Sequence, residues 1–127
     1  MQKNHFLLFA AVFGMLAVIL GAFGAHGLEK WLDPQLLKRF HTGVEYQFYH
    51  TLALFMTGLL WQQTPARGLA WAGYAFMAGI LLFSGSLYAY ALSGMKAFGM
   101  ITPIGGLGFI VGWGLLGWAV WQTPRTP

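Results

Sequence analysis

Four stretches of the chain are long and apolar enough to cross a membrane as helices. The first and the third contain no charged residue. A helix needs about 20 predominantly apolar residues to span the hydrocarbon core of a bilayer, and each stretch reaches about that length. They cover residues 5–25, 43–61, 69–93 and 104–121. The pattern predicts an all-α protein in which residues 1–127 form one integral membrane domain, a four-helix transmembrane bundle.

Between the first two stretches lies a segment that is too short and too basic to cross a membrane. Residues 34–41 combine three large apolar side chains with Lys38 and Arg39. A helix that carries both apolar and basic side chains lies at the membrane interface rather than across the hydrocarbon. We therefore expect a short interfacial helix here, which bends or flows into the second span near Gly43.

Three proline dipeptides predict where helices begin. A capping side chain followed by proline is a typical helix start, because the ring pre-sets φ and removes an amide that would be unpaired. The dipeptides are Asp33-Pro34, Thr64-Pro65 and Thr102-Pro103. We expect the first to open the interfacial helix, and the other two to open the third and fourth spans.

The composition excludes several classes of protein. Of the 127 residues, 57% are hydrophobic and 8% are charged, whereas an average soluble domain carries about 25% charged residues. A soluble domain of this length cannot bury so much apolar side chain. The absence of cysteine excludes a disulfide scaffold. The net charge of +4 comes from basic residues scattered among the connections, so we expect the lipid bilayer, and no nucleic acid, as a partner.

The first apolar run follows a basic residue, as the apolar region of a signal peptide does. It extends over about 20 residues, whereas a signal peptide has an apolar region of about 7–15. We therefore expect an uncleaved first span.

Four spans place the two termini and the connection 61–71 on one side of the membrane, side A. The connections 25–43 and 94–102 then lie on the opposite side, side B. Tryptophan favours the interface, and four tryptophans fall at the side A ends of the spans: Trp61, Trp71, Trp118 and Trp121. Side A carries three basic residues and side B carries four, so the charges leave the orientation open.

Small residues recur at intervals of four in three of the spans. Such stripes let helices approach closely in lipid, where no water drives their association. They are Ala17-Gly21-Ala25, Gly85-Ala89-Ser93 and Gly108-Gly112. We expect them to pack helices within the bundle, and contact between copies in a homo-oligomer is the alternative.

Polar side chains collect in the half of the bundle nearer side B. They lie at the end of the first span, in the first turns of the second and at the end of the third. Those that we expect to meet are His26, Tyr46, Gln47, Tyr49, His50, Ser84, Ser86 and Tyr88. Polar groups in hydrocarbon normally face the bundle interior in pairs. The pattern predicts an interhelical hydrogen-bond network, and a ligand pocket or proton path opening to side B is the functional alternative.

His41 and Glu45 are one helical turn apart, which puts both on one helix face as two metal ligands would lie. His50 lies about 140° around the helix from Glu45, so His26 would have to complete a site. Without cysteine and without an H-E-x-x-H run, no metal is expected. Haem held by His26 and His50 from adjacent helices is a remote alternative. We expect Glu45 to pair with a neighbouring side chain at headgroup level; facing the bundle, it would be a candidate proton carrier.

Four motifs follow one another along nearly the whole chain. They are Gly21-Ala22-Phe23-Gly24-Ala25-His26, Thr42-Gly43 leading to Tyr46-Gln47-Phe48-Tyr49-His50, Phe83-Ser84-Gly85-Ser86-Leu87-Tyr88, and Ile101-Thr102-Pro103-Ile104-Gly105-Gly106-Leu107. Together they resemble the domain-of-unknown-function family four-two-three, small bacterial multi-pass membrane proteins with an animal relative called transmembrane protein 256. The resemblance implies a four-helix protein of the bacterial inner (plasma) membrane and implies no particular activity. His41 and Glu45 lie between the motif positions.

The sequence favours a non-enzymatic protein without a cofactor. No serine lies in a G-x-S-x-G nucleophile elbow. We expect a structural or interaction protein that supports membrane integrity or a partner protein. A lipid, quinone or proton site between the first three helices is the alternative from another class, and a haem-binding electron-transfer subunit is a more remote one.

Overall fold

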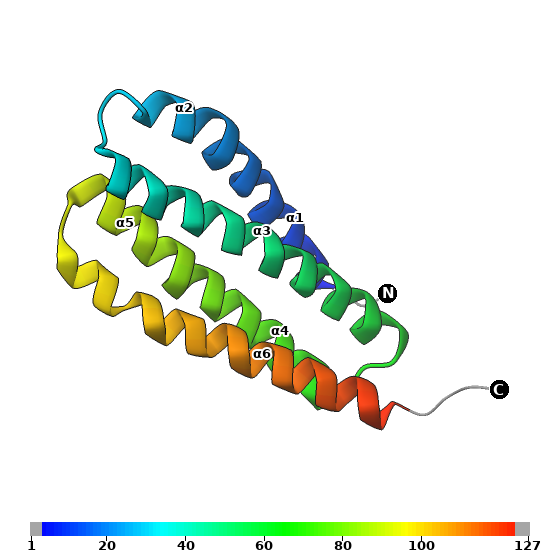
Figure 1. Ribbon diagram of the computed structural model, residues 1–127. Coiled ribbons are helices and arrows are strands. Elements are labelled where there is room, and N and C mark those ends of the chain that lie inside the picture. The colour runs from blue at the N-terminus through cyan, green and yellow to red at the C-terminus, as the bar shows by residue number, and fades with distance from the viewer. Residues whose placement is uncertain (1–3, 124–127) are drawn as a thin grey trace.

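The computed structural model describes residues 4–123, apart from the side chain of Ala25, and all regular elements among them are helices (Figure 1). This confirms the all-α prediction. In chain order the elements are α1 (His5–Val18), η1 (Ile19–Gly24), α2 (Ala25–Leu28), α3 (Pro34–Gln63), α4 (Arg67–Gly79), η2 (Ile80–Ser84), α5 (Gly85–Ser93), η3 (Lys96–Met100) and α6 (Thr102–Gln122). η1 and η2 are π-helical turns, and η3 is a 3-10 helix.

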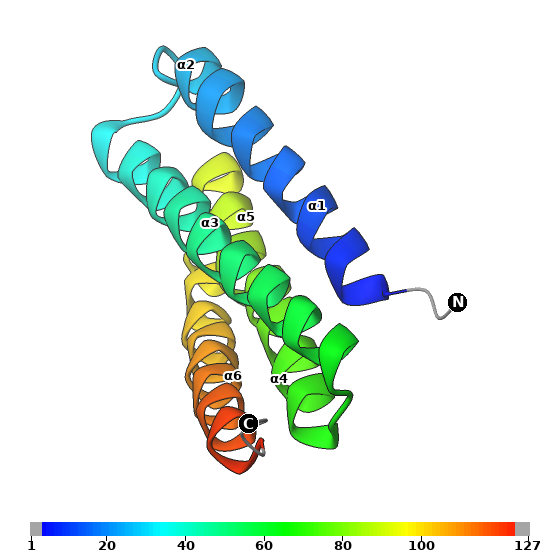
Figure 2. The same ribbon diagram turned by 90° about the vertical axis from the view of Figure 1, so that its right-hand side faces the viewer.

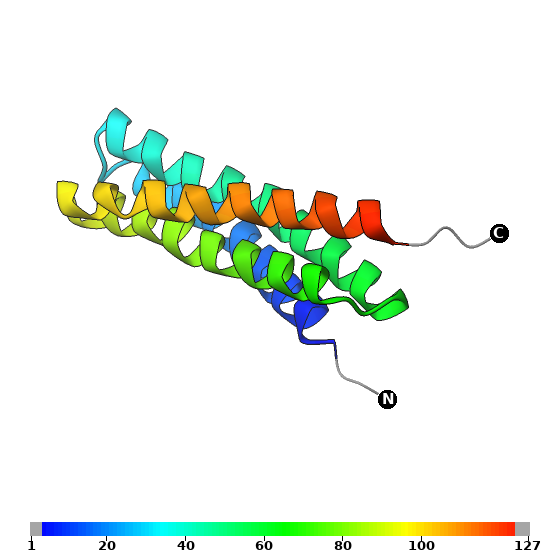
Figure 3. The ribbon, with the colours of Figure 1, turned by 90° about the horizontal axis from the view of Figure 1, so that it is seen from below.

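In this order of elements the described chain forms four long rods. They run alternately in opposite directions (Figures 1 and 3). η1 joins α1 to α2, and η2 joins α4 to α5, so each π-helical turn lies inside a continuous rod. α3 lies between the α1–α2 rod and the α4–α5 rod, and α6 packs on the α4–α5 rod (Figure 2). The start of α1, the end of α6 and the α3–α4 connection share one end of the bundle, which corresponds to side A. The α2–α3 connection and η3 share the other end, side B.

Three helical segments of the described chain are long and apolar enough to cross a membrane: His5–Leu28, Arg67–Ser93 and Lys96–Gln122. α3 has the length, at 30 residues, but it carries more polar side chains. Residues 34–41, for which we expected an interfacial helix that bends or flows into the second span, are the first turns of α3, and the helix continues through Gly43 without a break. The reason lies in packing. A Cβ at Gly43 would lie 2.8 Å from Cε1 of Tyr88, so this glycine permits close approach to α5 rather than a bend.

One of the three predicted helix caps is confirmed. The Asp33 side chain accepts a hydrogen bond of 2.9 Å from the Leu36 amide at the start of α3. The prediction for Thr64 is wrong, because Thr64 ends α3 and Ala66 precedes α4. Thr102-Pro103 opens α6 as predicted, with the proline in its first turn, but the Thr102 side chain does not cap the helix, because α6 follows η3 without the extended residue that a capping side chain needs.

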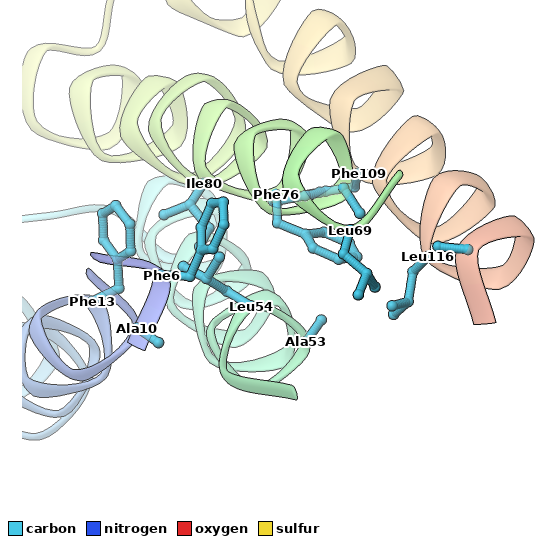
Figure 4. Packing of buried hydrophobic residues seen from close by; sticks show 12 residues of the cluster. Phe6, Ala10, Phe13, Ala53, Leu54, Leu69, Phe76, Ile80, Phe109 and Leu116 are labelled. Carbon is cyan, nitrogen blue, oxygen red and sulfur yellow. The ribbon is translucent and has the colours of Figure 1, made fainter. Parts of the chain in front are cut away.

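The largest hydrophobic core joins all four rods. Figure 4 shows its buried aromatic and aliphatic side chains, among them Phe6 of α1, Leu54 of α3, Phe76 of α4 and Phe109 of α6. A smaller cluster around Phe40 fills the side B half between α3 and α5. Buried packing in lipid is expected to contribute through close contact rather than through exclusion of water.

The outer surface of every rod is apolar. One leucine from each rod illustrates this: Leu8 is 63% exposed, Leu52 61%, Leu81 62% and Leu107 61%. A soluble monomer rarely exposes apolar patches of this extent. Six polar side chains of the described residues are buried inside the bundle: Gln47, His50, Thr51, Thr57, Ser84 and Ser86.

The small-residue stripes divide between inward and outward positions. A Cβ at Gly21 would lie 3.0 Å from Val44, and one at Gly112 would lie 2.7 Å from Phe76. Gly108 approaches the backbone of Gly79, and Ala17 is fully buried. In the remaining stripe, nothing lies within 4 Å of a Cβ at Gly85, Ala89 is half-buried and Ser93 is exposed. The side chain of Ala25 lies outside the described residues.

Candidate functional site: a buried polar network

Gln47 connects three helices from the middle of the bundle. Its side chain is buried on α3, and Nε2 donates a hydrogen bond of 2.8 Å to the Phe13 carbonyl of α1. The Tyr88 hydroxyl of α5 donates to Oε1 of the same amide at 2.5 Å. The amide nitrogen of Gln47 therefore binds α1, and its amide oxygen binds α5.

His50 lies one turn further along α3 and is also buried. Trp113 of α6 donates from Nε1 to His50 Nε2 at 3.1 Å, so Nε2 must be an acceptor without a proton. Nδ1 then carries the proton and donates it to the Tyr46 carbonyl at 2.8 Å. The Phe109 ring stacks on the imidazole with centroids 3.5 Å apart and planes 9° apart. These contacts fit a neutral histidine and use both of its nitrogens.

Two serines connect the α4–α5 rod to its neighbours on either side. Ser84 donates a hydrogen bond of 2.7 Å to the Gly43 carbonyl of α3. The Ser86 hydroxyl is 2.6 Å from that of Thr102 on α6 and 2.9 Å from the Phe83 carbonyl, to which it donates. Residues two apart on a helix point about 200° from each other. The spacing of the two serines therefore directs one hydroxyl to α3 and the other to α6.

The π-helical turn η2 is in very close contact with α6. A Cβ at Gly105 would lie 2.2 Å from the Phe83 nitrogen and 2.6 Å from its Cα, which no side chain could avoid by turning. π-helical turns inside α-helices are rare and are frequent at functional sites. Here the turn ends at Ser84, so it sets the position of the hydroxyl that bonds to α3.

The structure brings together most of the predicted polar residues. Gln47 and Tyr88 bond directly, and Tyr46 and His50 meet through the Tyr46 carbonyl and through rings 6.0 Å apart. Tyr49 is 54% exposed, and its ring lies 5.7 Å from the Tyr46 ring. His26 is exposed on α2 near side B and does not join the cluster.

Trp113 and Phe109 complete the site around His50, and neither was predicted from the sequence. Trp113 offered one signal. It lies in the middle of an apolar span, whereas membrane tryptophans favour the interfaces, and an indole N–H removed from water needs an acceptor. A tryptophan at that depth therefore implies a buried acceptor on a neighbouring helix. Phe109 carries no comparable signal in a helix of apolar residues.

Metal-ligating side chains are dispersed. Within residues 4–123, no three His, Cys, Asp or Glu side chains lie close enough to hold a metal ion. His41 and Glu45 are both exposed on α3. His50 lies about 24 Å along α3 from Pro34 at 1.5 Å per residue, well away from the side B end that carries His26.

Comparison of the sequence with known proteins shows the family to which the chain belongs. A family model described as "Protein of unknown function (DUF423)" matches residues 20–106, which is more than half of the chain. The chain belongs to this family. The UPF0382 membrane protein YwdK of Bacillus subtilis is 45% identical over 109 residues, 85% of this chain and 89% of the relative. The UPF0382 inner membrane protein YgdD of Escherichia coli is 40% identical over 116 residues, 91% of this chain and 88% of the relative.

The DUF423 protein described here is accordingly a multi-pass protein of the bacterial inner membrane. The matched residues 20–106 contain most of the buried polar network, from the Tyr46 carbonyl to Tyr88, and end just beyond Thr102. His50's partners Phe109 and Trp113 lie beyond that range. No solved structure matches the chain.

Proposed function

We propose that this protein is a non-enzymatic structural or interaction protein that crosses the bilayer four times. Its buried polar side chains join four membrane helices into one rigid body. The observation that carries the proposal is the closure of the His50 contacts. Tyr46, Phe109 and Trp113 occupy both nitrogens and one face of the ring, which leaves it no nitrogen free for a ligand.

α3 is the fourth span in this proposal. Its 30 residues are about 45 Å long, enough to cross the hydrocarbon and the headgroup layer. Its polar side chains at Gln47, His50 and Thr57 are buried against the other rods. Leu52 and Met56 on its outer face are 61% and 54% exposed. The inward polar residues lower its average apolarity, although the face that would meet lipid is apolar.

The lipid, quinone or proton site between the first three helices is the competing function. It would use the same Gln47 and His50, whose polar atoms already bond within the chain. A ligand would have to displace Trp113 or Tyr88 to reach them. Haem ligation would require His50 to exchange Trp113 for iron and His26 to approach from the side B end. The hydrogen bonds therefore favour the structural role.

Replacing His50 with alanine tests the structural role. We expect His50→Ala to lower the unfolding free energy by about 2–4 kcal/mol, because it removes two hydrogen bonds and leaves the Trp113 N–H unpaired. The matched control is His26→Ala, which removes an exposed histidine and should leave the thermal melting temperature unchanged. Both melting curves are measured on protein purified in one mild detergent.

The competing function gives a different result. A pocket at His50 would carry a small molecule through purification. Native mass spectrometry would then detect a stoichiometric added mass in the unmodified protein that His50→Ala loses while the fold survives. That outcome would overturn the structural proposal. Unaltered stability in His50→Ala would overturn it as well, because the hydrogen bonds would then contribute nothing.

A further inference from the structure

A basic cleft lies at the side B end of the bundle, apart from the polar network. It has a volume of about 370 Å³ and is lined by Gln35, Lys38, Arg39 and Thr42 of α3 and by Leu87 of α5. The four α3 residues follow the spacing i, i+3, i+4 and i+7, so they share one helix face. The cleft is therefore a consequence of the first two turns of α3 continuing as helix rather than forming a separate element.

The donor groups in the cleft suit a phosphate. Its lining includes two cations and no carboxylate. The Arg39 guanidinium lies 4.6 Å from the centre of the Tyr90 ring on α5, a cation–π contact that holds it toward the cleft's α5 wall. A planar guanidinium, an ammonium group and the Gln35 amide together offer N–H donors to the cleft. Arginine and lysine are the side chains that proteins use most to bind phosphate.

The position of the cleft identifies the source of the phosphate. Residues 35–42 precede the apolar part of α3, so in a protein whose α3 crosses the bilayer they lie at headgroup level. Leu87 makes one wall apolar. A volume of about 370 Å³ is within the usual range for small-molecule sites, roughly 300–1,000 Å³. We propose that this cleft binds the headgroup of an anionic phospholipid through Lys38 and Arg39, an inference that rests on α3 being a membrane span.

The test compares lipids on the purified, detergent-solubilised protein. Phosphatidylglycerol or phosphatidylcholine is added, and native mass spectrometry measures the occupancy of bound lipid. We expect phosphatidylglycerol to bind at least about tenfold more tightly than phosphatidylcholine, and Lys38→Gln/Arg39→Gln to weaken it about tenfold or more. The matched control is Lys30→Gln, which removes one charge at the same end of the bundle outside the cleft, and it should retain the binding.

Three results would overturn the proposal. Equal weakening by Lys30→Gln would indicate general charge attraction. Equal binding of phosphatidylcholine would remove the role of headgroup charge. If inorganic phosphate stabilised the protein as much as phosphatidylglycerol does, the ligand would be a free anion rather than a lipid. Circular dichroism confirms that each variant is folded, and because the assay is made in detergent, its failure leaves the crossing of the bilayer by α3 unaffected.

Discussion

Gly105→Ala is expected to be the most destabilising glycine-to-alanine substitution in this protein. The added Cβ would lie 2.2 Å from the Phe83 nitrogen and 2.7 Å from the Leu82 carbonyl carbon. Both are backbone atoms of the π-helical turn η2, so no side chain can rotate away. The helices must separate, and we expect the unfolding free energy to fall by about 3 kcal/mol or more. Thermal melting of the purified protein in detergent measures the loss.

Gly106→Ala is the matched control for this substitution. A Cβ at Gly106 would lie 3.8 and 3.9 Å from two ring carbons of Phe83, which is ordinary van der Waals contact. Alanine also favours a helix interior over glycine by about 1 kcal/mol. We expect the melting temperature to stay equal or to rise. Similar destabilisation by the two substitutions would mean that α6 does not approach η2 at Gly105.

Gln47→Ala is expected to have the second largest effect. It removes the amide that connects Phe13 on α1 to Tyr88 on α5, and it leaves the Tyr88 hydroxyl without its acceptor. Two lost hydrogen bonds, an unpaired buried hydroxyl and a cavity together cost about 3–5 kcal/mol. The measurement is again the melting temperature in detergent. Gln63→Ala, at the exposed end of α3, removes the same amide and should change nothing.

A double-mutant cycle isolates the contact between Gln47 and Tyr88. Tyr88→Phe alone removes only the hydroxyl and should cost about 1–2 kcal/mol. In the Gln47→Ala background the same change should cost little, because its acceptor has already gone. Additive losses would show that the two side chains do not interact, and would remove Gln47 from the centre of the network.

The helical elements could be predicted from the sequence mainly because apolar length determines them locally. The four predicted stretches all lie within rods of the bundle, and Asp33 caps α3 as expected. The sequence left open whether residues 34–41 bend at Gly43 or continue into the second span. Gly43 packs closely against Tyr88 of α5, and α3 continues through it as one helix. The π-helical turns η1 and η2 were not predicted from the sequence.

The sequence predicts where in the bundle the polar residues lie, but it does not predict which side chains bond to one another. Counting residues from the helix ends places Gln47 and His50 at a depth where polar groups need partners. The rotation of each helix decides which partner is met. That rotation turns His26 outward and brings Trp113 to His50. Periodicity within one helix contains no information about how its neighbours are rotated.

Both the proposed structural role and the proposed lipid site require that α3 crosses the bilayer. The natural chain contains no cysteine, so single cysteines can be introduced at the two ends of α3. Lys30→Cys precedes the helix at side B, and Gln63→Cys ends it at side A. A membrane-impermeant maleimide is applied to spheroplasts before and after permeabilisation. We predict that exactly one of the two cysteines reacts in intact spheroplasts and that the other reacts only after permeabilisation. Reaction of both cysteines from the same side would mean that α3 does not cross the membrane, and would contradict the four-span bundle.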